Sequence, residues 1–486
     1  MSHHFDLVIR NAHCATGADT FMADIGVRDG IISALGQGLA SGAQEIDAKG
    51  AWVTPGGVDG HCHLAEPIKG DVEMADDFLS GPRSAACGGT TTIIPFAVQQ
   101  RGQSLREAVE QYHQRAGQQS CVDYAFHMIL TDANQQVLNE ELPALIEQGY
   151  TSFKIYMTYE DMMLSDREII NTLAVAREHG ALVMVHAENF DCIAWLTERL
   201  LAAGHTAPKY HAQSRPMLVE REATHRAISF AELVDVPILI VHVSGKEAIE
   251  QIQWAQNKGL KIYAETCPQY LFLSTDDLGG EDDYEATKCI CSPPPRDPQN
   301  QAYVWDGLQA DTFSIFSSDH APFSYADPKG KQAFGDKPSF DKVANGIPGL
   351  ETRLPLLFSH GVMSGKISIE QFVQITSTNV AKMYGLYPRK GSLSIGADAD
   401  FIIWDTETQR TIRNANLHHA VDYTPYEGIT VNAWPAMTFS RGTLLWNQGE
   451  FVAPQGHGQF LKCGMPQPAK PKVHSQPFKR QEAQHG

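Results

Sequence analysis

The segment Val58-Asp-Gly-His61-Cys-His63 places two histidines one residue apart at the end of a predicted strand. In an extended chain, residues i and i+2 point to the same side, so both imidazoles can face one metal ion. Histidine is the commonest metal ligand, and the chain contains 20 of them. A single pair is also compatible with two hydrogen-bonded core histidines, so its meaning depends on what the other strand ends carry.

Four further predicted strands end in a residue that can bind a metal or take part in catalysis. One polar residue at the end of one buried strand is more often a hydrogen-bonded core residue than a ligand. A series of such positions in chain order favours an active site, because the carboxyl ends of parallel barrel strands meet at one face. The four residues are Lys154 in Ser152-Phe-Lys-Ile155, His186 after Leu182-Val-Met-Val185, His242 after Leu239-Ile-Val241, and Asp319 after Thr312-Phe-Ser-Ile-Phe-Ser-Ser318.

The middle of the chain alternates apolar strand-like runs with helix-like stretches, as in 90–95 followed by 104–118. Repeated strand–helix units over roughly 330 residues predict an α/β protein with a parallel sheet, either closed as a (β/α)8 TIM-like barrel or open and doubly wound. The sequence contains neither the G-x-G-x-x-G motif after its first strand nor a P-loop. The absence of both motifs favours the barrel.

Both ends of the chain are rich in short β-strands, for example 5–10 near the start and 400–404 near the end. We expect the two ends to pack together as one small β-sandwich domain. The predicted boundaries are 1–54 for the first part of this domain, 55–388 for the barrel, 389–464 for the second part of the β-sandwich and 465–486 for an extended C-terminal tail.

Composition limits the possible partners and the cellular location. Asp and Glu number 57 against 38 Lys and Arg, a formal net charge of −19, which argues against binding to nucleic acid or to an anionic membrane. We find no secretory signal and no apolar run long enough to span a bilayer. The nine cysteines form no C-x-x-C pair, which is typical of reduced thiols, so we predict a soluble cytoplasmic protein.

Lys154 differs in charge from the other candidate ligands. A lysine ammonium, with an ordinary pKa of about 10.4, would repel cations held by four histidines and Asp319. A Schiff-base lysine is an alternative, but that chemistry needs no surrounding metal ligands. If the amine takes up CO2, it becomes an anionic carbamate whose oxygens can each bind one of two metals about 3.5–4 Å apart. Asp319, the carbamate and a bridging hydroxide would then neutralise most of the charge of two divalent ions.

The strand-end residues belong to longer motifs that extend along nearly the whole chain. These motifs are Pro55-Gly-Gly-Val-Asp-Gly-His-Cys-His63, Gly88-Gly-Thr-Thr-Thr92, Phe153-Lys154, His186, His242, Ser318-Asp-His320, Asn345-Gly-Ile-Pro-Gly349 and Lys390-Gly-Ser-Leu-Ser-Ile-Gly-Ala-Asp-Ala-Asp400. As a set they resemble the amidohydrolase superfamily, and within it the dihydropyrimidinase/hydantoinase family of cyclic-amide hydrolases. In that superfamily the last motif leads into the β domain formed from both chain ends.

The resemblance implies a centre of two zinc ions per subunit, bridged by N6-carboxylysine at Lys154. Each zinc would be bound by one pair of histidines, namely His61 with His63 and His186 with His242. Asp319 would complete the shell of the first zinc and relay the proton of a bridging hydroxide, which attacks the ring amide carbonyl. Asp319 would then pass this proton to the departing ring nitrogen.

The resemblance also implies roles around the substrate. Tyr159, five residues after Lys154, matches the tyrosine that stabilises the oxyanion in hydantoinases, so Tyr159 and Asp319 are the implied catalytic residues. Ser292 and Asn345 match positions that hold the cyclic amide, largely through backbone hydrogen bonds. The implied reaction opens a dihydropyrimidine or a 5-substituted hydantoin to the N-carbamoyl amino acid, by hydrolysis of a C–N bond. Family members are usually tetramers, so we expect a homotetramer or a dimer.

Three alternatives were weighed against this reaction. Dihydroorotases usually read H-x-H-x-R, and this chain has Ala65 in place of the arginine. Allantoinases share His-Leu-Ala-Glu-Pro and Cys-Ser-Pro-Pro but generally lack the tyrosine at 159 and Asn-Gly-Ile-Pro-Gly, so allantoinase or another cyclic imide or ureide hydrolase is the alternative. A non-catalytic scaffold resembling the collapsin-response mediators is less favoured, because every implied ligand is present.

A few other residues carry a weaker signal. Glu188, two residues after His186, can be a supporting carboxylate of the site or a solvated loop residue. His320 belongs to the Asp319 motif and needs no separate role. Cys62 and Cys87 are interpreted as buried packing residues.

Overall fold

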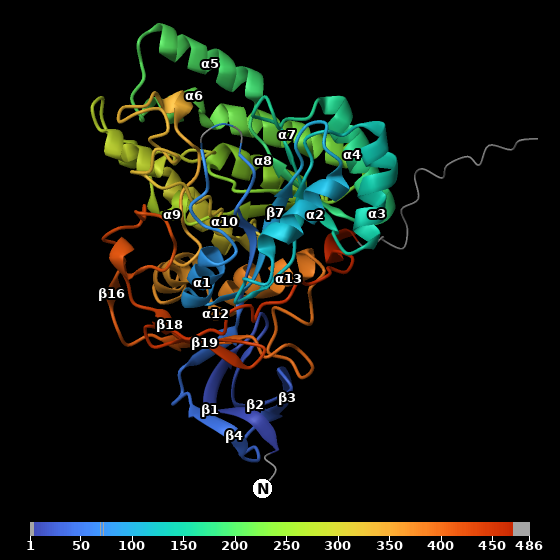
Figure 1. Ribbon diagram of the computed structural model, residues 1–486, viewed down its shortest axis with the longest axis vertical. Coiled ribbons are helices and arrows are strands. Elements are labelled where there is room, and N and C mark those ends of the chain that lie inside the picture. Colours follow the sequence, from blue (N-terminus) through green and yellow to red (C-terminus); the bar gives the residue numbers. More distant parts are fainter. Residues whose placement is uncertain (1–3, 69, 71, 470–486) are drawn as a thin grey trace, which may run out of the picture.

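A computed structural model describes residues 4–68, 70 and 72–469. Most of the predicted C-terminal tail, from 470 onward, lies outside the described residues. The described chain forms two large sheets, one from the middle of the sequence and one from its two ends (Figure 1). None of the helices in this part of the chain is both long and apolar enough to cross a membrane.

The central sheet is parallel, and its strands follow one another in chain order from β6 to β14, with the short β8 beside β7. Most of these strands are buried on both faces, as expected for a parallel sheet covered by helices. The strands are β6 (Gly57–Cys62), β7 (Thr90–Val98), β8 (Asp123–Tyr124), β9 (His127–Ile129), β10 (Ser152–Tyr156), β11 (Leu182–His186), β12 (Ile238–Ile240), β13 (Ile262–Thr266) and β14 (Ile315–Phe316).

The chain that follows β14 returns to the first strand of this sheet. Cys62 and His320 form a parallel bridge, and the His63 amide donates to the His320 carbonyl at 2.7 Å. The strand order and this contact are consistent with a TIM-like barrel. The predicted α/β class and parallel sheet are therefore confirmed.

Helices connect consecutive strands and cover the outside of the sheet (Figure 1). In α4, Ser165 and Glu168 form a capping box at the start, and Gly180 ends the helix in the left-handed region. The longer helices are α1 (Ser80–Cys87), α2 (Leu105–Ala116), α4 (Asp166–His179), α5 (Phe190–Ala202), α7 (Met217–Val234), α8 (Lys246–Asn257) and α10 (Asn300–Gln309). Shorter ones are α3 (Leu142–Glu147), α6 (Tyr210–Ser214), α9 (Gln269–Phe272), α11 (Arg353–Leu357), α12 (Ile369–Val373) and α13 (Asn379–Met383).

The second sheet contains strands from both ends of the chain, in the order β20-β19-β18-β15-β5-β1-β2-β3, with β4 beside β1. The two ends meet where β5 pairs antiparallel with β15, for example Pro55 with Phe401. The strands are β1 (Phe5–Ala15), β2 (Thr20–Arg28), β3 (Ile31–Gly36), β4 (Gly42–Asp47), β5 (Trp52–Pro55), β15 (Phe401–Asp405), β18 (Trp434–Ser440), β19 (Thr443–Asn447) and β20 (Glu450–Phe451). The predicted β-sandwich is not confirmed, because these strands form one continuous sheet; the predicted boundaries remain predictions.

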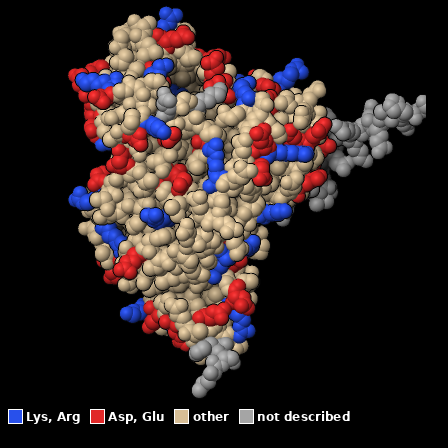
Figure 2. Space-filling model, viewed as in Figure 1, with Lys and Arg blue, Asp and Glu red and all other residues tan. Residues whose placement is uncertain are grey.

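A buried ionic cluster joins this sheet to the base of the barrel. Lys390 Nζ lies 2.6 Å from Asp123, 2.8 Å from Asp400 and 2.9 Å from Asp398. Asp123 begins β8 and also pairs with Arg441 at 3.1 Å. The cluster therefore lies at the amino ends of the barrel strands, the face that in this fold serves stability. On the surface, Figure 2 shows acidic and basic side chains interspersed over the visible face.

Candidate metal centre

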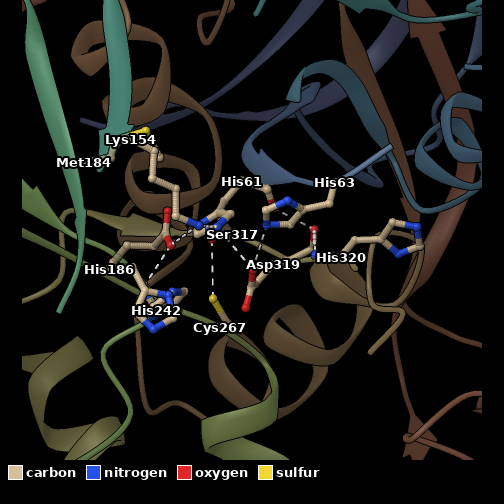
Figure 3. A network of polar contacts seen from close by, with 12 residues as sticks. His61, His63, Lys154, Met184, His186, His242, Cys267, Ser317, Asp319 and His320 are labelled. Atoms are coloured by element: carbon tan, nitrogen blue, oxygen red, sulfur yellow. Dashed lines mark hydrogen bonds and ion pairs between the residues drawn. The ribbon is translucent and has the colours of Figure 1, made fainter. Parts of the chain in front are cut away.

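His61 and His63 face a common point at the carboxyl end of β6 (Figure 3). Asp319 Oδ1 lies 3.1 Å from His61 Nε2 and 3.5 Å from His63 Nε2. One ligand atom from each of the three residues lies within 4.8 Å of the other two. The i, i+2 pair and the distant aspartate thus form one compact group of potential metal ligands.

The second histidine pair lies next to the first. His186 at the end of β11 and His242 just after β12 approach each other at 2.9 Å, from Nδ1 to Nε2. Lys154 on β10 points into the same space, with Nζ 2.8 Å from His61 Nε2. The ring centroids of His61 and His242 are 5.4 Å apart. The fold therefore brings the six predicted metal ligands together.

Two of these ligands and the predicted oxyanion residue have unusual backbone conformations. Tyr159, His242 and Asp319 have φ angles of 64°, 40° and 47°. Non-glycine residues rarely occupy this left-handed region, which costs about 1–3 kcal/mol and is common at functional sites. The surrounding structure holds these three residues in place against that cost.

Three carboxylates support the imidazoles from behind. His61 Nδ1 lies 2.6 Å from Glu265 Oε1, His63 Nδ1 lies 2.6 Å from Glu66 Oε1, and His186 Nε2 lies 2.7 Å from Glu188 Oε2. Such partners fix the orientation of an imidazole and leave its other nitrogen for a metal. In each case that other nitrogen faces the centre, as the contacts with Asp319, Lys154 and His242 show.

Sequence reasoning found these carboxylates only in part. Glu188 is fully buried, so its interpretation as a solvated residue was wrong and the supporting role was right. Glu265 and Glu66 were missed. Glu265 ends the apolar strand β13 in the same way that His186 ends β11, and this signal could have identified it.

The buried environment favours the metal-binding forms of most of the nitrogen ligands. Burial lowers the pKa of His61, His186 and His242, so the imidazoles are held neutral. Burial also lowers the pKa of Lys154, which favours the neutral amine. Burial alone would raise the pKa of Asp319, but His61 and the other histidines hold it well below its usual range. At His63 burial is outweighed by neighbouring carboxylates, which raise the pKa instead. The site thus combines mostly neutral nitrogen donors with an ionised carboxylate.

The donor set fits two divalent cations. Four imidazoles, an amine nitrogen and a carboxylate are present, and zinc binds nitrogen and oxygen ligands of these kinds. His242 Nδ1 is buried and has no hydrogen-bond partner among the described residues. An unsatisfied buried imidazole nitrogen is costly in a finished core, and it indicates that this part of the protein is completed by a bound group.

The predicted substrate residues lie beside this centre. Tyr159, Ser292 and Asn345 line a cavity of about 310 Å³ together with the metal-centre residues other than His61. Asn345 Nδ2 donates a weak hydrogen bond to Tyr159 Oη at 3.4 Å. The cavity has further walls from Glu66, Met74, Tyr156, Met162 and Phe323. A small ring with one substituent fits a space of this size.

A buried ion pair that sequence reasoning missed lies between the metal ligand His186 and the predicted oxyanion residue Tyr159. Arg215 Nη1 lies 2.8 Å from Glu188 Oε2, and both side chains are buried. The guanidinium carbon of Arg215 also lies 5.4 Å from the centre of the Tyr159 ring. Because Glu188 in turn contacts His186, one ion pair supports both a metal ligand and the predicted oxyanion residue.

A parallel α/β barrel with histidines, a lysine and an aspartate at the carboxyl ends of its strands defines a hydrolase of the metal-dependent barrel class. Comparison with known proteins specifies the class further. The profile of the amidohydrolase family matches residues 52–445. The chain belongs to this family.

The chain is similar to hydantoinases and to a dihydropyrimidinase. The chain is 43% identical to a D-hydantoinase of Geobacillus stearothermophilus, over 94% of this chain and 96% of the relative. It is 38% identical to a D-phenylhydantoinase of Escherichia coli, over 94% and 98%. The crystal structure of the dihydropyrimidinase from Brevibacillus agri superposes with a TM-score of 0.91 at 41% identity, covering 94% of this chain and 98% of that one. The family assignment made from the sequence is therefore confirmed.

Proposed function

We propose that this protein hydrolyses a cyclic amide, opening a dihydropyrimidine or a 5-substituted hydantoin to the corresponding N-carbamoyl amino acid. The observation that carries the proposal is the convergence of six ligand-type side chains at a small cavity, which five of them line together with Tyr159, Ser292 and Asn345. The full-length similarity to D-hydantoinases supports it.

Two zinc ions are the cofactors that we propose for this site, bridged by a carboxylated Lys154. His61, His63 and Asp319 would hold one ion, and His186 and His242 the other. When bound, such a pair of ions supplies a hydroxide nucleophile at neutral pH and polarises the substrate carbonyl. The neutral Lys154 amine favoured by burial is the form that can react with CO2.

The protein's own residues would then position the ring and move the proton. Asp319 is ionised, so its carboxylate can accept the proton of the nucleophile and deliver it to the departing ring nitrogen. Burial raises the pKa of Tyr159, which keeps its hydroxyl protonated to donate a hydrogen bond to the developing oxyanion. Ser292 and Asn345, which line the same cavity as Tyr159, would hold the amide edge of the ring.

Two further proposals concern the whole molecule. From the family resemblance we propose a homotetramer, with a dimer as the smaller alternative. From the cysteine pattern we propose a cytoplasmic location. Size-exclusion chromatography with light scattering would measure the first, and fractionation of the source cells the second.

Allantoin hydrolysis is the second candidate activity. The position of Glu66 favours it, because this carboxylate lines the cavity and is not one of the proposed metal ligands. A metal-free interaction scaffold is a third possibility, but the complete set of ligand-type side chains argues against it.

Metal analysis and a substrate panel test the proposal. The purified protein should contain about two zinc ions per subunit and should convert at least one of dihydrouracil, hydantoin, 5-phenylhydantoin or allantoin to its ring-opened product. The panel should also contain dihydroorotate and succinimide, to separate neighbouring activities. A metal-loaded protein that opens none of these rings would overturn the proposed function.

A further inference from the structure

Among the described residues that line the cavity, Glu66 is the one carboxylate that the proposed chemistry does not use. Its side chain is 9% exposed, and its Oε1 contacts His63 Nδ1 at 2.6 Å. No described residue forms a hydrogen bond with Oε2, while Glu66 lines the cavity. One oxygen therefore supports a metal ligand, and the other is left for whatever occupies the cavity.

The cavity divides into a part for the ring and a part for its substituent. The reacting carbonyl must lie at the metal-ligand wall, and the amide edge of the ring must face Tyr159, Ser292 and Asn345. The lining residues that remain include Glu66, Met74, Tyr156, Met162 and Phe323. Because these residues have no role toward the ring amide, they surround the group attached to the ring.

Among the described residues, this substituent region combines apolar walls with one charged group, Glu66. Met74, Met162 and Phe323 offer no strong hydrogen-bond donor. Tyr156 carries a hydroxyl but forms no hydrogen bond with Glu66, so the free oxygen of Glu66 depends on water or on the substrate for a partner. An alkyl or phenyl substituent would displace that water and leave the carboxylate oxygen unpaired, whereas a substituent with N–H groups would satisfy it.

We propose that Glu66 is a specificity-determining residue that selects cyclic amides whose ring substituent carries N–H donors, such as a ureido group, over those with an apolar substituent of the same shape. The inference rests on the proposed cyclic-amide hydrolysis and names the class of substrate that this site prefers. A buried acceptor built to receive a donor discriminates strongly against analogues that lack it.

Two hydantoins with substituents of equal size and branching test this preference. Allantoin carries a ureido group at C5, and 5-isobutylhydantoin carries its apolar counterpart. Wild-type protein loaded with zinc should show a kcat/KM for allantoin roughly 10–100-fold higher than for 5-isobutylhydantoin, the range expected for one unpaired buried acceptor. E66M should remove most of this ratio, and E66Q, which keeps one acceptor oxygen, should lie between.

The ratio of the two kcat/KM values distinguishes two roles of Glu66: selecting the substrate and supporting His63. Any loss of metal affinity or chemistry caused by a Glu66 variant affects both substrates equally and cancels in the ratio. Glu73→Gln is the matched control, because Glu73 lies in the same loop, is exposed and pairs with Lys329 at the surface. This variant should keep the wild-type ratio.

Three results would overturn the inference in distinguishable ways. A wild-type preference for 5-isobutylhydantoin, or a ratio that E66M and E66Q leave unchanged, would refute the role of Glu66 while leaving cyclic-amide hydrolysis intact. If E66M does not fold, E66Q alone carries the comparison. If the wild-type protein opens neither these rings nor dihydrouracil, the proposed function fails and the inference fails with it.

Discussion

Two lysines with the same burial occupy opposite ends of the barrel and have opposite surroundings. Lys154 and Lys390 are each 1% exposed. Lys390, at the amino ends of the strands, is enclosed by the carboxylates of Asp123, Asp398 and Asp400. Lys154, at the carboxyl ends, has an imidazole nitrogen of His61 as its hydrogen-bond neighbour and lies 4.8 Å from the centre of the Phe96 ring.

The difference in surroundings changes the charge of the two amines. Burial favours the neutral form of Lys390, but Asp400, Asp123 and Asp398 outweigh it and raise the pKa of Lys390 above its usual range. At Lys154 the effect of burial prevails, and the pKa is lowered. A permanently charged lysine can hold two domains together, whereas a neutral amine can act as a nucleophile toward CO2 or as a ligand. The charged cluster around Lys390 therefore serves stability, whereas the neutral Lys154 belongs to the site of the proposed reaction.

Replacing Lys154 should have the largest effect. K154M should lower kcat/KM about 1000-fold or more, because the proposed metal pair provides several kcal/mol of transition-state stabilisation and needs its bridging ligand. The zinc content should fall below two per subunit while the far-ultraviolet circular dichroism stays unchanged. An active K154M protein with full zinc would refute the proposed bridge.

Replacing Lys390 should damage stability instead of chemistry. K390M removes the cation shared by three buried carboxylates, of which Asp123 and Asp398 keep only an arginine partner at the edge of the cluster. Breaking a buried ion pair in this way costs about 3–5 kcal/mol. Denaturant unfolding should show this loss, while kcat and zinc content per folded subunit should match the wild type. If K390M lost activity without losing stability, the separation between the two lysines would be wrong.

A smaller effect is expected at the ion pair that supports the metal centre. E188Q replaces the carboxylate between His186 and Arg215 by a neutral amide. Partners of this kind typically change metal affinity or activity about 10–100-fold. Zinc affinity measured by chelator competition should fall by this amount. Glu247→Gln, which removes a carboxylate from an exposed pair with Arg221, should leave zinc affinity unchanged.

The smallest effect is expected at a third buried lysine, Lys331, and it concerns the dependence of stability on pH. Lys331 Nζ donates to the carbonyls of Ile290 and Ala344, each at 3.0 Å, close in sequence to Ser292 and Asn345. Burial lowers the pKa of Lys331 to about 7. Between this value and the unfolded value of about 10.4 the unfolded chain binds the extra proton, so the free energy of unfolding rises with pH in that window.

K331M should lack this dependence on pH. The stability of the wild type relative to K331M should increase from pH 7 to pH 9, by at most about 1.4 kcal/mol per pH unit, and stay constant below the folded-state pKa. Denaturant unfolding at several pH values measures the difference. Lys366→Met, which removes an exposed lysine, is the control and should show no such trend. A flat difference for K331M would show that Lys331 keeps its proton in the folded state.

The sequence indicated the barrel and the metal ligands because both follow from short-range patterns. Strand β7 and helix α2 lie where the apolar run 90–95 and the helix-like stretch 104–118 predicted them. The ligands His186 and His242 could be identified because each follows an apolar run, and the carboxyl ends of parallel strands share one face. The sheet shared by the two chain ends was anticipated, whereas its arrangement as a sandwich was not confirmed.

What a side chain does in this protein depended on contacts that only the tertiary structure shows. His61 and Glu265 are 204 residues apart in sequence, yet their side chains meet at 2.6 Å. The dual position of Glu66, behind His63 and along the cavity, also depends on how its loop folds over the strand ends. The sequence alone determined which residue types end the strands. The tertiary structure decided their charge, since desolvation and Coulomb interactions depend on every group packed around a side chain and not on its neighbours in the chain.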